Sequence, residues 1–126
     1  MKEKKMKKTI VILVMLLAAT ALFADPINLG NFPVGKWLDS KYNAVWDFSS
    51  GNIRILDKSG AVLYDFSKKT VQNFKVFLDG TSPGITFSCT EAGRTYKFTK
   101  PLTGSDVIMQ IDRAGLPAYK VTMPKQ

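Results

Sequence analysis

The side chains that most often carry enzyme chemistry are scarce in this chain. It has no histidine and a single cysteine, Cys89. Without histidine there is no Ser-His-Asp or Cys-His catalysis, no imidazole general base and no histidine-ligated metal. One cysteine forms neither a thiolate metal cluster nor an internal disulfide. We therefore expect no catalytic residue, no metal site and no cofactor.

Carboxylates are the remaining candidates for acid–base chemistry, and they are dispersed along the chain. Most of them fall at turns or on the polar faces of expected strands. Asp47 and Asp65 differ because they occupy matching places in two similar segments, so they could come near each other. We favour solvated strand-face residues over a catalytic pair, and we expect that the protein is not an enzyme.

The basic residues raise the question of an anionic partner. The formal net charge is +8, but about half of it comes from the first eight residues, where five lysines meet one glutamate. Further lysines could form a patch interleaved with aromatic residues, as in proteins that bind single-stranded nucleic acid; these are Lys68, Lys69, Lys75, Lys97 and Lys100. Solvated lysines that protect strand edges explain this set more simply. We expect no nucleic-acid partner.

The first 24 residues have the layout of a secretory signal peptide. A lysine-rich start precedes an apolar run that begins at Ile10, and small residues lead to Ala24 before the polar break Asp25-Pro26. The apolar run is short against the roughly 20 residues that a membrane-spanning helix needs. We therefore expect cleavage after Ala24, export to the periplasm or the exterior, and no stable membrane span after cleavage.

The chain after this leader is expected to be an all-β domain. Residues 25–34 hold two prolines and have no clear period, which predicts an extended lead-in with Phe32 or Val34 against the body. From residue 35 to 126, short apolar–polar alternations are separated by turn residues every 8 to 12 positions. No stretch has convincing helical periodicity. The pattern predicts eight or nine short antiparallel strands that run up and down in chain order.

Two of the expected strands allow more detailed predictions. Cys89 alternates with Ile85 and Phe87, which predicts a small buried side chain rather than a reactive thiol. Between residues 71 and 78, Phe74, Val76 and Leu78 make one face while the other face mixes apolar and charged residues. A β-bulge, or a strand covered on both sides, would explain that mixture.

An aromatic-x-Phe pattern recurs in the chain. Trp46-Asp47-Phe48 returns as Tyr64-Asp65-Phe66 and, more weakly, as Tyr96-Lys97-Phe98. This spacing places both rings of each copy on one face of a strand, and in an up-and-down arrangement they would face one interior. Repeated core packing is the simpler interpretation, and an aromatic-lined pocket is the alternative.

A further aromatic residue marks the start of the strand pattern, at Gly35-Lys36-Trp37. With the leader and the up-and-down pattern, this Gly-x-Trp step resembles the lipocalin and calycin-like barrels. The resemblance implies a small antiparallel up-and-down barrel over residues 35–126, with Trp37 across its closed end beneath a basic residue. Arg113 and Lys120 are the candidates for that basic partner. Small barrel-shaped inhibitors of secreted metalloproteases are similar in having an extended segment before the barrel.

We therefore expect an exported, lipocalin-like binding protein rather than an enzyme. In the first hypothesis a small apolar or amphipathic ligand is bound by aromatic side chains, through apolar burial and ring stacking; the candidates are Trp37, Trp46, Phe48, Tyr64, Phe66, Tyr96 and Phe98. In the second, residues 25–34 and nearby loops bind an extracytoplasmic protein, for instance a protease. A third alternative is a structural envelope protein.

Overall fold

The computed structural model describes residues 24–126. The predicted signal peptide, apart from Ala24, therefore lies outside the described residues. Within the described part of the chain, no helix is both long enough and apolar enough to cross a membrane.

Nine strands and one short 3-10 helix follow the lead-in. The strands are β1 (Gly35–Asp39), β2 (Ala44–Ser49), β3 (Asn52–Leu56), β4 (Val62–Asp65), β5 (Val71–Asp79), β6 (Ser82–Cys89), β7 (Arg94–Thr99), β8 (Val107–Arg113) and β9 (Leu116–Met123). The helix η1 (Phe66–Lys68) joins β4 to β5. The all-β class and the number of strands expected from the sequence are confirmed.

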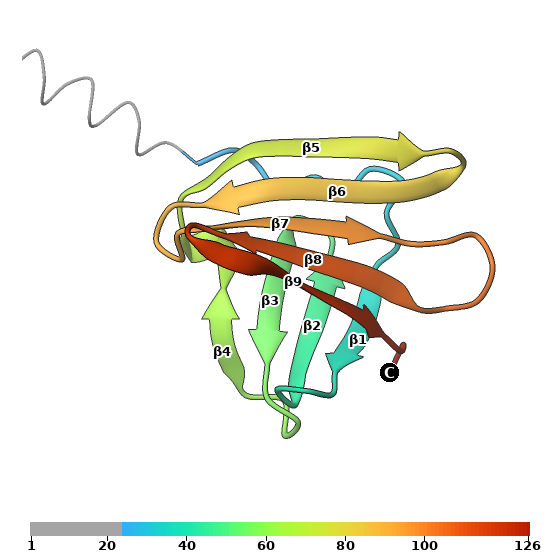
Figure 1. The fold of residues 1–126 in the computed structure, drawn as a ribbon. Coiled ribbons are helices and arrows are strands. Elements are labelled where there is room, and N and C mark those ends of the chain that lie inside the picture. The colour runs from blue at the N-terminus through green and yellow to red at the C-terminus, as the bar shows by residue number, and fades with distance from the viewer. Residues whose placement is uncertain (1–23) are drawn as a thin grey trace, which may run out of the picture.

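The strands form two antiparallel sheets in chain order (Figure 1). One sheet has the order β1-β2-β3-β4 and the other the order β5-β6-β7-β8-β9. In Figure 1 the strands of the first sheet run across the direction of the second, as in an orthogonal packing of two layers. Over residues 24–126 both sheets are open, so the single closed barrel that we expected is not formed.

The break between the sheets lies at η1. The Asp65 carboxylate accepts hydrogen bonds from the Ser67 amide at 3.0 Å and the Ser67 hydroxyl at 2.6 Å. The alternation in the sequence continues to Phe66, but this cap ends β4 one residue earlier, at Asp65, and starts η1. Phe66 therefore reaches the core from a helix, where we expected a strand, and β4 does not pair with β5.

The opposite ends of the two sheets meet at the C-terminus. The Leu38 amide donates to the Pro124 carbonyl at 2.9 Å, and the Gln126 amide donates to the Lys36 carbonyl at 2.8 Å. Residues 124–126 thus extend from the five-stranded sheet and pair with β1 of the four-stranded sheet. Backbone pairing ties the two layers at this corner, whereas β4 and β5 on the other side do not pair.

Aromatic rings fill most of the space between the layers. Trp46 lies 5.2 Å from Phe98, Phe48 lies 5.0 Å from Phe98, and Trp46 lies 5.8 Å from Phe66, measured between ring centroids. Trp46, Phe48, Phe66 and Phe98 are all buried. The expectation that the rings of the repeated pattern face one interior is confirmed. Cys89 is also buried, as predicted.

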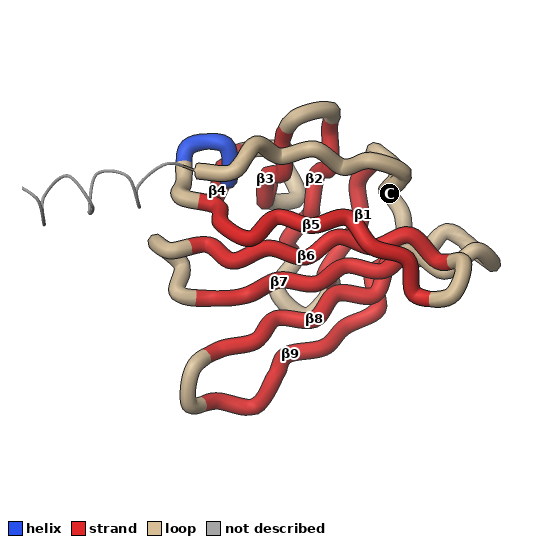
Figure 2. The backbone as a smooth tube through the Cα atoms, turned by 90° about the horizontal axis from the view of Figure 1, so that it is seen from above, coloured by secondary structure: helices blue, strands red, loops and turns tan. Residues whose placement is uncertain are grey.

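The lead-in is packed on the body (Figure 2), where it lies along the β5 side of the domain. The Asp25 amide donates to the Val71 carbonyl at 2.7 Å, and the Phe74 amide donates to the Asp25 carboxylate at 3.1 Å. Phe32 is buried, whereas Val34 is 58% exposed. Phe32 is therefore the residue that anchors this segment, and the lead-in is not a free arm.

The predicted bulge occurs in β5. The pairing with β6 shifts between Gln72 and Lys75, and Asn73 has a φ of 56°. Val76 and Leu78, which the alternation puts on one face with Phe74, are 45% and 65% exposed. β5 is an edge strand, so only its first half has core side chains beneath it.

Candidate functional site

Gly35 and Trp37 lie at the corner where the two sheets meet. Gly35 has a φ of 149°, and a Cβ there would lie 3.1 Å from the Trp37 ring. Trp37 is buried, and its indole N–H donates to the Ser105 carbonyl at 2.7 Å. The Lys125 ammonium lies 5.9 Å from the ring centroid. The basic partner of Trp37 is therefore Lys125, and neither Arg113 nor Lys120 takes that place.

A cavity of about 260 Å³ opens between the two sheets. Its walls come from the inner faces of both layers; they are formed by Asp39, Tyr42, Ala44, Trp46, Ile55, Arg94, Met109, Ile111, Arg113 and Tyr119. Half of these side chains are apolar. Tyr42 and Arg94 are exposed and define the mouth, while Trp46 and Met109 are buried and define the floor.

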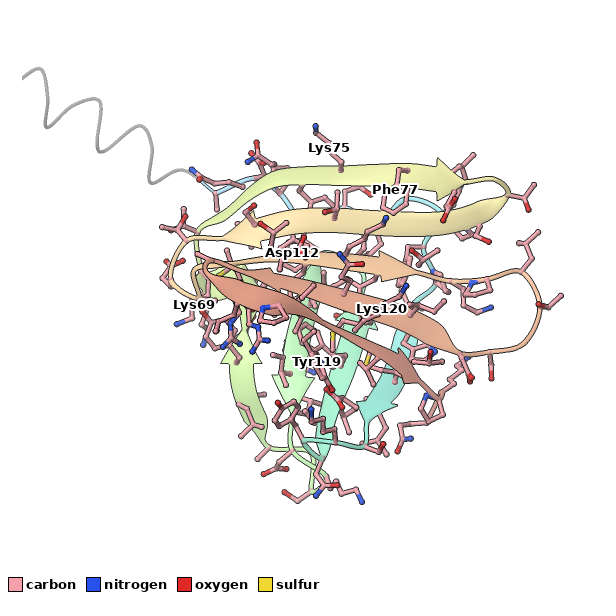
Figure 3. The ribbon with its side chains drawn as sticks, viewed as in Figure 1. Lys69, Lys75, Phe77, Asp112, Tyr119 and Lys120 are labelled. Atoms are coloured by element: carbon pink, nitrogen blue, oxygen red, sulfur yellow. The ribbon has the colours of Figure 1, made fainter. Side chains whose placement is uncertain are left out.

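One wall of the cavity is closed by a hydrogen bond between the sheets. The Tyr119 hydroxyl lies 3.0 and 2.9 Å from the two carboxylate oxygens of Asp39, which is only 2% exposed. The Lys41 amide donates to the same carboxylate at 3.1 Å. Burial, and then the Asp39 carboxylate, raise the pKa of Tyr119 to about 12. Figure 3 shows Tyr119 on the side of β9 that faces the four-stranded sheet.

The cavity lining also includes two arginines from neighbouring strands. Arg94 on β7 and Arg113 on β8 are direct partners in the antiparallel pairing. Arg94 is in phase with the buried Tyr96, and Arg113 is in phase with the buried Ile111, so both side chains belong to the inner face. Burial raises the pKa of Tyr96, and the charge of Arg94 and its hydrogen bond with this tyrosine act in the opposite direction.

These arginines lack acidic partners. Within residues 24–126, neither Arg94 nor Arg113 forms an ion pair with a carboxylate. The Arg113 Nη2 donates to the Pro117 carbonyl at 2.7 Å, which fixes the side chain, while its Nε is buried without a hydrogen-bond partner. Asp112 lies near both arginines, but it accepts a hydrogen bond from Gln110 at 3.1 Å.

Only one of the seven aromatic residues predicted to bind ligand lines the cavity, and that residue is Trp46. Trp37 lies at the closed corner, and Phe48, Phe66, Tyr96 and Phe98 are buried among one another. Tyr64 is half-buried, with its hydroxyl 3.6 Å from the Cys89 sulfur. Ligand contact by these side chains stays a prediction, and their common feature in the structure is core packing.

Asp47 and Asp65, the matching carboxylates of the repeat, share one row of the four-stranded sheet with Arg54 between them. The Arg54 guanidinium donates to Asp47 at 2.7 Å. Asp65 instead caps η1, and its pKa is lowered chiefly by the Ser67 hydroxyl. The two carboxylates are therefore separated by a strand and bound to different groups.

The sequence interpretation missed Arg94 as a site residue and considered Arg113 only as a partner for Trp37. A signal was present, because each arginine continues the alternation of core-facing residues in its strand: Arg94-x-Tyr96-x-Phe98 and Met109-x-Ile111-x-Arg113. A charge in phase with a core face marks a place where the core opens. Comparisons with protein-family models, curated proteins and solved structures gave no match.

Proposed function

We propose that this protein is a binding protein for a small apolar or amphipathic ligand, held in the cavity between the two sheets. The observation that carries the proposal is the cavity itself. It is about 260 Å³, close to the lower end of ligand pockets at about 300 Å³, and it combines apolar walls with a few converging polar groups. Burial of apolar ligand surface against Trp46, Ile55 and Met109 would supply the affinity.

The arrangement of the chain supports a distant likeness to lipocalin-like binding proteins. Neighbouring strands pair in chain order, the C-terminal residues pair with β1, and Trp37 lies beneath Lys125 at that corner. The proposal includes export of the chain, which depends on the signal-like leader of residues 1–24.

The alternative of an interaction module, such as a periplasmic protease inhibitor, has less support. Its contacts were expected in residues 25–34 and nearby loops, and Ile27, Leu29 and Phe32 of that segment are buried in the core. Exposed side chains remain in the segment, among them Asn28, Asn31 and Val34, but the buried ones hold it against the body, so it does not project toward a partner protein.

Titration with an uncharged apolar probe tests the proposal. Octanol should change the emission of Trp46, which lines the cavity, and the change should disappear in a Trp46→Phe variant that retains Trp37. Ala44→Leu adds volume inside the cavity and should weaken binding. Ala118→Leu, on an exposed position of β9, is the matched control. If Ala44→Leu has no more effect on the affinity for octanol than Ala118→Leu has, the probe binds outside this cavity.

A further inference from the structure

The two arginines at the mouth of the cavity repel each other, and nothing else in the fold of residues 24–126 accounts for placing two like charges side by side. Arg94 and Arg113 are directly opposite each other on β7 and β8. Directly opposite side chains on antiparallel strands have their Cβ atoms about 4.5–5.5 Å apart, and like charges in that position destabilise a sheet. Neither guanidinium is compensated by a carboxylate within residues 24–126.

The Arg113 guanidinium is also placed where an anion would complete its bonding. The Arg113 Nε is buried and has no hydrogen-bond partner, although the same side chain is fixed through its Nη2 to Pro117. A buried donor without a partner is costly unless a ligand supplies an acceptor. A carboxylate can accept two parallel hydrogen bonds from a guanidinium, which makes arginine the side chain best suited to hold it.

The remaining walls indicate what is attached to the anion. Beside the arginines lie the apolar side chains of Trp46, Ile55 and Ile111, and the cavity holds only a small molecule. The one carboxylate of the wall, Asp39, is already bound to Tyr119 and to the Lys41 amide. Asp39 thus accepts hydrogen bonds from its neighbours, whereas the Arg113 Nε lacks an acceptor and neither arginine has a carboxylate partner within residues 24–126.

From this arrangement we infer that the ligand is a small organic anion, an apolar body with a carboxylate or similar acidic group, whose acid is held between Arg94 and Arg113. The inference rests on the proposed function and narrows the ligand class. The apolar body lies toward Trp46 and Met109, and the acid remains at the mouth of the cavity beside the exposed Arg94.

Three probes with one apolar chain and different head groups test this inference, namely octanoate, octanol and octylammonium. Calorimetric titration of the protein at neutral pH and low salt should give octanoate an affinity roughly tenfold or more above that of octanol. The advantage should shrink as salt is added, because salt screens charge attraction at the mouth. Octylammonium should bind more weakly than octanol.

Variants then assign the preference to the two residues. Arg94→Gln and Arg113→Gln together should remove the advantage of octanoate while octanol still binds. Arg113→Lys keeps the positive charge but not the guanidinium, so it separates the effect of charge from that of guanidinium geometry. Thermal unfolding of each variant checks that it is folded. Lys120→Gln removes the same charge from β9 outside the cavity lining and should leave the preference intact.

The outcomes separate this inference from the proposed function. Equal affinity for octanoate and octanol would overturn the inference and leave the cavity as an uncharged apolar site. A preference for octylammonium would overturn it in favour of Asp39 as the selecting group. Failure of all three probes to bind would overturn the proposed function and the inference together.

Discussion

The Tyr119 hydroxyl, on the last strand, donates to the carboxylate of Asp39, on the first strand, at 3.0 and 2.9 Å from its two oxygens. The two residues are 80 positions apart in the chain. Their contact joins the five-stranded sheet to the four-stranded sheet at the wall of the cavity. It satisfies a carboxylate that would otherwise be buried with only the Lys41 amide as a donor.

Tyr119→Phe should therefore destabilise the fold. The substitution keeps the ring and leaves Asp39 short of a donor, which costs roughly 1–3 kcal/mol for a buried polar group. Urea unfolding followed by fluorescence measures the change. Tyr42→Phe is the control, because Tyr42 is 62% exposed and its ring packs near the same Tyr119. Equal stability of both variants and the parent protein would contradict a structural role for this bond.

The same contact predicts how stability depends on alkaline pH. The pKa of Tyr119 is raised to about 12, against 10.0 for an ordinary tyrosine, so the folded state favours the neutral phenol. Above pH 10 the unfolded chain loses this proton first. The contribution of Tyr119 to the free energy of unfolding is therefore fully present below about pH 10, and it is lost as pH rises toward 12.

Unfolding free energies measured across that range should show a smaller decline in Tyr119→Phe. Some decline should remain, because burial also raises the pKa of Tyr64 and of Tyr96. An identical decline in the parent protein and the variant would mean that Tyr119 does not contribute to it.

Gly35→Ala should destabilise the corner between the sheets more than an ordinary glycine replacement. The φ of 149° is disfavoured for any residue with a Cβ, and that atom would lie 3.1 Å from the buried Trp37 ring. We expect a loss of about 1–3 kcal/mol. Gly51→Ala is the matched control, since Gly51 also has a positive φ of 79° but open space around a Cβ. A greater loss in Gly35→Ala than in Gly51→Ala would support the contribution of the crowded corner, and equal losses would contradict it.

Removal of residues 124–126 should weaken the same corner by a different route. It removes two backbone hydrogen bonds to β1, each worth about 0.5–1.5 kcal/mol, together with the Lys125 ammonium over Trp37. Lys125→Ala in the full chain removes only the cation–π contact and should cost about 0.5–1 kcal/mol. Chemical unfolding compares the two proteins. A truncated chain as stable as the parent protein would show that pairing at this corner is dispensable.

The sequence by itself determined the class of the fold and most of its strands. Strict alternation, as in Ile85, Phe87 and Cys89, depends only on the two-residue period of a strand, and the structure places all three side chains in the core. Turn residues at regular intervals likewise predicted neighbouring strands that pair in chain order. The absence of histidine limited the available chemistry without any reference to the fold.

Tertiary structure decided how the strands divide into sheets and which strand residues are covered by the opposite layer. The Asp65 cap bends the chain into η1 through a local hydrogen bond, so the strands divide into two open sheets instead of one barrel. Val76 and Leu78 match the core pattern of their strand and are nevertheless exposed, because β5 is an edge strand. A period of two assigns a residue to a face, and it does not tell how far the opposite layer extends.

The residues of the candidate site were also determined by tertiary structure. The aromatic-x-Phe pattern indicated residues that face the interior, but their distances from one another depend on how the two layers cross, and that crossing packs most of the rings together. Arg94 and Arg113 become a pair only through the register of β7 and β8, and Asp39 meets Tyr119 only because the first and last strands lie in facing layers. Sequence spacing contains neither the register nor the angle between the layers, so the cavity belongs to the tertiary structure alone.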